Sequence, residues 1–185
     1  MTNIVIVEDK LKNGMDLARQ FEELAKAHQE LDVRVKAICL FYEDSQKEAE
    51  AAIESVAADN REYEIRTVSL YDFEDVMDEY MIEQAEPTIA IMDFLLESAT
   101  DSGARGIPAR RVNIRYTRRA DKNVQDRIWF YTTSGKENVE ILCDLFGQEH
   151  VLKVDTFKEG RLSLHLEDKA FMAALQDVGA MPQMV

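Results

Sequence analysis

Side chains that could do chemistry together lie at or near the ends of short apolar segments of this chain. They are Glu8, Asp9, Asp93, Thr132 and Lys153. Carboxylates packed together without a counter-charge repel one another, and a bound divalent cation removes that cost. Hard oxygen ligands of this kind suit Mg²⁺ better than Zn²⁺. With the cation in place, a free carboxylate oxygen becomes a nucleophile toward a phosphoryl group, while a lysine neutralises the transferring oxygens.

The apolar residues alternate between two periods, and this alternation predicts the elements that would bring those side chains together. Short apolar or β-branched runs predict strands at 3–7, 33–41, 63–70, 88–92, 128–131 and 151–154. Three- and four-residue spacing predicts helices at 11–28, 49–56, 73–81, 139–146 and 170–178. Strands that alternate with helices imply a doubly wound α/β domain with a parallel sheet of about six strands. The active crevice of such a sheet lies beyond the carboxyl ends of its strands.

Four motifs at successive predicted strand ends resemble the receiver domain of two-component response regulators, a CheY-like family. They are IVIVED from residue 4, TIAIMD from residue 88, WFYTTSGKEN from residue 129 and HVLKV from residue 150. The resemblance spans roughly residues 3–175 with two insertions. It implies a flavodoxin/CheY-like fold with an extra βα unit.

The resemblance also implies a role for each chemical side chain. Asp93 would accept the phosphoryl group, and Glu8 and Asp9 would be the acidic pair that holds Mg²⁺ with it. Thr132 would hydrogen-bond the phosphoryl oxygen, and Lys153 would pair with it. The resemblance therefore predicts a phospho-accepting site with Mg²⁺ as cofactor.

Several residues differ from the family pattern. His150 stands at the aromatic switch position, where an imidazole could still swing inward and outward. Val154 replaces the usual proline, so we expect a trans peptide bond before it. Thr133 replaces a small residue and could crowd the phosphoryl pocket. Leu95, two positions after Asp93, lies next to the path of a hydrolytic water in the family and predicts slow loss of the phosphoryl group.

The chain organisation predicts one receiver-like domain over residues 1–178 and a C-terminal tail at 179–185. Residues 63–80 resemble the family's second strand and helix, so 31–61 is the predicted first insertion. The second insertion is 104–122.

The second insertion reverses the charge of the chain, which has 22 bases, 36 acids and a net charge of -14. Its bases are Arg105, Arg110, Arg111, Arg115, Arg118, Arg119 and Lys122. One interpretation is a solvated loop that neutralises its own domain or a second copy in a homodimer. The other is a docking element for an acidic partner. Val112, Ile114 and Tyr116 alternate, which predicts a short strand or hairpin.

The composition excludes several classes of protein. The chain has 185 residues, 46% of them hydrophobic and 31% charged, which suits an ordinary globular protein. Cys39 and Cys143 lie in apolar stretches without metal-binding spacing, so we expect reduced thiols and a cytoplasmic location. The first residues lack the pattern of a signal peptide and no apolar run reaches the length of a membrane-spanning helix, so we expect neither feature. The acidic surface disfavours nucleic acid and anionic membranes.

Three functions remain open from the sequence. The leading hypothesis is a stand-alone receiver that takes a phosphoryl group onto Asp93 from a histidine kinase or phosphotransfer protein. It would signal to a downstream protein partner and catalyse at most its own phosphorylation and dephosphorylation. The second is a pseudo-receiver, an interaction module without phosphotransfer. The third is an Mg²⁺-dependent phosphatase, which would need a second aspartate where Leu95 stands.

Overall fold

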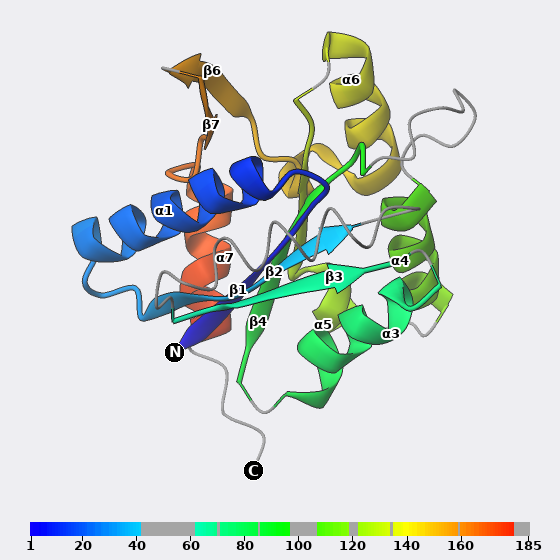
Figure 1. The fold of residues 1–185 in the computed structure, drawn as a ribbon, viewed down its shortest axis with the longest axis horizontal. Helices are drawn as coiled ribbons and strands as arrows, with labels where there is room; N and C mark the ends of the chain where they lie inside the picture. The colour runs from blue at the N-terminus through cyan, green and yellow to red at the C-terminus, as the bar shows by residue number, and fades with distance from the viewer. Residues whose placement is uncertain are drawn as a thin grey trace.

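A parallel β-sheet forms the centre of the computed structural model. The structure describes residues 1–41, 62–69, 71–84, 86–96, 107–118, 122–133, 135–158 and 160–179. The sheet strands are β1 (Thr2–Glu8), β2 (Val33–Phe41), β3 (Glu64–Val68), β4 (Thr88–Asp93) and β5 (Ile128–Tyr131). Their order is β3-β2-β1-β4-β5, and every pair is parallel (Figure 1).

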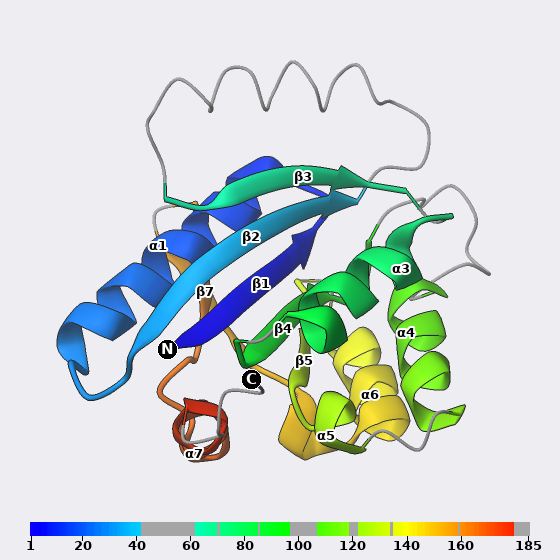
Figure 2. The same ribbon diagram turned by 90° about the horizontal axis from the view of Figure 1, so that it is seen from below.

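Helices cover both faces of the sheet, as Figure 2 shows. One face carries α1 (Leu11–Ala27) and α7 (Lys169–Gly179). The opposite face carries α3 (Phe73–Asp78), its π-helical continuation η1 (Glu79–Glu83), α4 (Ile107–Arg118), α5 (Lys122–Gln125) and α6 (Gly135–Phe146). The predicted doubly wound α/β fold is therefore confirmed. No helix in these described ranges is long and apolar enough to cross a membrane.

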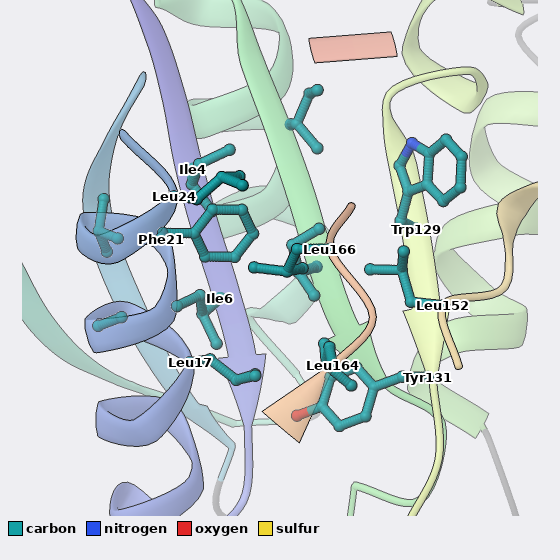
Figure 3. Packing of buried hydrophobic residues seen from close by; sticks show 14 of the residues in the cluster. Ile4, Ile6, Leu17, Phe21, Leu24, Trp129, Tyr131, Leu152, Leu164 and Leu166 are labelled. Carbon is teal, nitrogen blue, oxygen red and sulfur yellow. The ribbon is translucent and has the colours of Figure 1, made fainter. Parts of the chain in front are cut away.

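The central strands are apolar throughout because both of their faces are buried. Ile4 and Ile6 point toward α1, where they pack with Leu17 and Phe21 (Figure 3). The alternate residues of β1 belong to the second core, on the side of α3 and α4. Two cores separated by one sheet hold the carboxyl ends of the strands in a rigid frame.

Gly14 lets α1 lie unusually close to the sheet. A Cβ atom at this position would lie 2.7 Å from Ile38 Cγ2 and 3.9 Å from Glu8 Cβ. Since 2.7 Å is shorter than a normal carbon–carbon contact, any larger residue would push the helix away from β2. The close approach brings the first turns of α1 beside the end of β1.

The last predicted core strand is much shorter than expected. Only Val151 forms a parallel bridge, with Phe130, and Leu152 N–H donates to Phe130 O at 2.8 Å. The chain then leaves the sheet and forms an antiparallel hairpin, β6 (Val154–Lys158) and β7 (Arg161–Leu164). The prediction of a sixth core strand over 151–154 was therefore wrong in its extent.

Polar side chains of α1 form hydrogen bonds with this hairpin. Asp16 Oδ2 accepts from Leu162 N–H at 3.1 Å, and Gln20 Oε1 accepts from Leu164 N–H at 3.1 Å. Helix side chains therefore satisfy backbone donors of β7 that a further strand would otherwise pair.

The sheet order shows where the two strands on either side of residues 42–61 lie. β2 lies directly beside β1, and β3 lies at the outer edge. Residues 37–41 of β2 are all buried, whereas 64–67 of β3 are at best half-buried, as suits an edge strand. The assignment of 31–61 as the first insertion stays a prediction. Residues 42–61 lie outside the described part of the chain.

The predicted strand or hairpin in the basic insertion was wrong, because α4 occupies that segment. Ala109, Val112 and Tyr116 are all fully buried against the sheet and lie on one helical face. Ile114, which completed the apparent alternation, is 47% exposed. Helical spacing of the buried residues was hidden in the sequence by one exposed isoleucine.

Candidate functional site

The carboxyl ends of β1, β4 and β5 meet at one edge of the sheet because these neighbouring strands are parallel. Asp93 pairs in register with Tyr131, and Val7 with Met92. Side chains alternate along a strand, so Glu8 projects on the α1 side like Ile6. Asp93 and Tyr131 share that side for the same reason.

Three carboxylates gather at this edge. One oxygen from each of Glu8, Asp9 and Asp93 lies within 4.8 Å of the other two. Glu8 is fully buried, Asp93 is 3% exposed and Asp9 is half-buried. We call this set the acidic cluster. It could hold a metal ion, and its purely oxygen ligands fit a hard divalent cation.

Protein donors hold the Glu8 carboxylate from two sides. The Tyr131 hydroxyl donates to Oε1 at 2.8 Å, and Asn13 Nδ2 donates to the same oxygen at 3.0 Å. Lys10 N–H donates to Oε2 at 2.7 Å. These bonds connect β5 and α1 to β1, so Glu8 is fixed by elements on both sides.

Burial dominates the electrostatics of the acidic cluster. Burial and then the charge of Asp93 raise the pKa of Glu8 well above its ordinary value. Burial raises the pKa of Asp93, while the Leu95 N–H donated to its Oδ1 at 3.1 Å opposes the rise. Burial and the neighbouring carboxylates also raise the pKa of Tyr131, which keeps its hydroxyl a donor. The raised pKa values mean that the buried carboxyls of the acidic cluster favour their protonated forms. A bound cation would compensate the charge of the ionised carboxylates in place of those protons.

Thr132 and Lys153 lie in different surroundings. Thr132 is 4% exposed and follows Tyr131 directly, so its backbone lies at the same sheet edge. Lys153 is exposed and lines a hollow of about 420 Å³ together with Trp129 and other residues. The lysine whose charge lowers the pKa of Asp93 is Lys10. The pairing of Lys153 with a phosphoryl group stays a prediction.

His150 packs near the start of β5. It lies in the short helix η2 (Gln148–His150), half-buried, with its ring centroid 5.4 Å from that of Trp129. Its Nδ1 lies 3.2 Å from Ile128 O, at the opposite end of β5 from Thr132. A switching role for His150 stays a prediction.

Basic side chains of α4 pair with acids of α3. Arg111 Nη2 lies 2.8 Å from Glu74 Oε2, and Arg115 Nη2 lies 2.6 Å from Asp78 Oδ2. These bases therefore neutralise their own domain, in agreement with the first of the two interpretations. Arg110 is exposed. The side chain of Arg118 and the whole of Arg119 lie outside the described residues.

No protein-family model, curated protein or solved structure matches the chain. The function is therefore argued from the acidic cluster and from the parallel sheet, which is consistent with a flavodoxin/CheY-like doubly wound fold.

Sequence reasoning missed Tyr131 and Asn13 as members of the site. A signal for Tyr131 existed, because period-two alternation in β5 predicts which face each residue takes once the strand is assigned. Its contact with Glu8 crosses the intervening strand β4, which requires the strand order. Asn13 required the close approach of α1, which the sequence does not show.

Proposed function

We propose that this protein is a receiver-like phospho-acceptor, in which Asp93 takes a phosphoryl group with Mg²⁺ bound at the acidic cluster. The observation that carries the proposal is the convergence of Glu8, Asp9 and Asp93 within 4.8 Å at the carboxyl ends of neighbouring parallel strands. Ligand crevices of doubly wound sheets lie at this position.

The proposed reaction is a phosphoryl transfer from a phosphohistidine. A carboxylate oxygen of Asp93 attacks phosphorus, the O–P bond forms, and the P–N bond to the imidazole breaks. The imidazole leaves with the bonding electrons and takes up a proton. The Leu95 N–H that Asp93 Oδ1 accepts orients the nucleophile for this attack.

Other residues of this edge have supporting roles in the proposal. Glu8, Asp9 and Asp93 would hold Mg²⁺, which when bound offsets the charge of the carboxylates and of the transferring oxygens. Thr132 would donate its hydroxyl to a phosphoryl oxygen. Lys10, whose charge already acts on Asp93, is a candidate for the cationic role beside Lys153.

Thermal unfolding with Mg²⁺ and beryllofluoride tests the proposal. Beryllofluoride mimics the phosphoryl group on an aspartate, so the wild-type unfolding midpoint should rise by about 5–10 °C at about one hundred times Kd. Treatment with phosphoramidate, whose P–N bond resembles that of phosphohistidine, should add one phosphoryl group per chain by intact mass. Both effects should disappear in Asp93→Asn.

Asp16→Asn is the matched control, because Asp16 is also buried and its substitution keeps an oxygen acceptor toward β7. This variant should respond like the wild type. The proposal fails if the wild type shows neither a stability change nor a mass change, or if Asp93→Asn retains both.

A second candidate function, an interaction module without phosphotransfer, is favoured by two observations. Glu8 is already satisfied by three protein donors, from Tyr131, Asn13 and Lys10, and Lys153 lines a separate hollow. An intact fold that binds no Mg²⁺ and takes up no phosphoryl group would support this candidate over the first.

A further inference from the structure

The hydrogen bonds on Glu8 leave it little capacity to bind a cation. An ionised carboxylate offers about four lone-pair sites, two on each oxygen. Oε1 accepts from both the Tyr131 hydroxyl and Asn13 Nδ2, so both of its sites are taken. Oε2 accepts from Lys10 N–H. These donors leave one site, on Oε2. Glu8 also hydrogen-bonds to the other two carboxyls of the acidic cluster, and these are the contacts that a bound cation would replace.

The surroundings hold Glu8 in this arrangement. Glu8 and Tyr131 are both fully buried, and Tyr131 belongs to the core on the face of the sheet that carries α1 and α7 (Figure 3). The carboxylate therefore cannot turn both oxygens toward the acidic cluster without breaking buried hydrogen bonds.

We infer that Tyr131 and Asn13 determine cation specificity by restricting Glu8 to one oxygen ligand, which favours Mg²⁺ over Ca²⁺. This inference rests on the proposed Mg²⁺ site. Ca²⁺ takes six to eight oxygens and commonly uses a bidentate carboxylate, whereas Mg²⁺ is smaller and binds through single carboxylate oxygens and water. Blocking Oε1 removes a ligand that Ca²⁺ would use and Mg²⁺ does not need.

Calorimetric titration of Mg²⁺ and of Ca²⁺ into the wild type, Tyr131→Phe and Asn13→Ala tests this inference. Each substitution frees one site on Oε1. The ratio of the Ca²⁺ to the Mg²⁺ dissociation constant should fall roughly tenfold. Loss of a residue that hydrogen-bonds a metal ligand typically changes metal affinity by about this factor or more. A residue that only supports the fold would weaken both ions alike and leave the ratio unchanged.

Tyr80→Phe is the matched control. Its buried hydroxyl donates to Glu64 Oε2 at 2.8 Å, at the opposite face of the sheet, so the same kind of bond is lost away from the acidic cluster. The ratio should not change in this variant. Asn13 is only half-buried, so Asn13→Ala keeps the test decisive if Tyr131→Phe does not fold.

The outcomes separate this inference from the proposed function. If the wild type binds Mg²⁺ and both site variants keep the wild-type ratio, the specificity role of Tyr131 and Asn13 is wrong and the phospho-acceptor proposal stands. If the wild type binds neither ion, both are wrong.

Discussion

Leu95 affects Asp93 through both its backbone and its side chain. Its N–H donates to Asp93 Oδ1, and the side chain is partly buried against the second core, two positions after the proposed acceptor. The resemblance to receiver domains implies that this side chain lies next to the path of a hydrolytic water, and an apolar group there offers the water no hydrogen-bond partner. At the scale of single residues, we therefore expect Leu95 to prolong the lifetime of a phosphoryl group on Asp93.

We predict that Leu95→Asn shortens the lifetime of phosphorylated Asp93 roughly tenfold, which corresponds to about 1.4 kcal/mol in the hydrolysis barrier. The amide supplies a polar partner for the attacking water and leaves the backbone N–H in place. The decay of the phosphorylated mass in Mg²⁺ buffer measures this lifetime. Leu95→Met, which conserves volume and polarity, should behave like the wild type; an equal lifetime in Leu95→Asn would contradict the prediction.

Helix α1 connects the acidic cluster to the hairpin β6–β7. Its first turns carry Asn13, which bonds Glu8, and Gly14, which allows the close approach to β2. The next turns carry Asp16 and Gln20, which accept backbone N–H groups of β7. One helix therefore supports both the proposed site and the segment that replaces a sixth sheet strand.

At this scale, Asp16→Ala should destabilise the protein by about 1–3 kcal/mol, because the buried N–H of Leu162 loses its acceptor. Asp16→Asn keeps a carbonyl oxygen at the same place and should cost less than half as much. Urea unfolding at neutral pH measures both free energies. Equal losses in the two variants would mean that the charge of Asp16, rather than this hydrogen bond, matters.

The whole molecule has a formal net charge of -14, and three of its acids form the acidic cluster at one edge of the sheet. The ion pairs of α4 with α3 compensate part of the acidity on the opposite face. In the described part of the chain, the acidic cluster has no such arginine partner. Its charge is therefore expected to couple folding to pH and to cations.

Without a divalent cation, the free energy of unfolding should fall as pH rises from about 4.5 toward about 9. The pKa of Glu8 is raised from 4.5 to about 9, so the folded state keeps a proton that the unfolded chain has lost across this window. Since the folded state binds more protons, the slope of stability against pH is negative. A bound cation compensates the ionised carboxylates, so Mg²⁺ should stabilise the protein more at about pH 8.5 than at about pH 5.5.

Thermal unfolding with and without MgCl₂ at the two pH values measures this coupling. Repulsion among the other acids also destabilises the protein at high pH, so the Mg²⁺-dependent difference is the relevant quantity. Glu8→Gln removes the titrating group and should reduce that difference. An Mg²⁺ effect that does not depend on pH, or that Glu8→Gln leaves unchanged, would contradict the prediction.

Local patterns in the sequence were sufficient for most strands and helices. The buried strands of the sheet are continuous apolar runs, and α1, α6 and α7 show clear helical spacing. Parallel strand direction then follows from the alternation of strands and helices. The meeting of Glu8, Asp9 and Asp93 was predictable in turn, because parallel strands end at one edge.

Contacts between distant segments could not be predicted from those patterns. Contacts between segments far apart in the sequence decide three features of the fold. These are the order of β2 and β3, the departure of residues 154–164 into a hairpin, and the helix α4. Such choices are decided by burial and by partners for backbone groups, which are properties of the assembled chain.

The residues of the candidate site divide in the same way, into those that the sequence predicts and those that only the tertiary structure brings together. Residue type and strand position were enough to select the three carboxylates, because ionisable groups at strand ends are visible one segment at a time. Tertiary structure alone decided that Tyr131 reaches Glu8 across β4 and that Asn13 approaches from α1, since each bond depends on strand order and on helix distance.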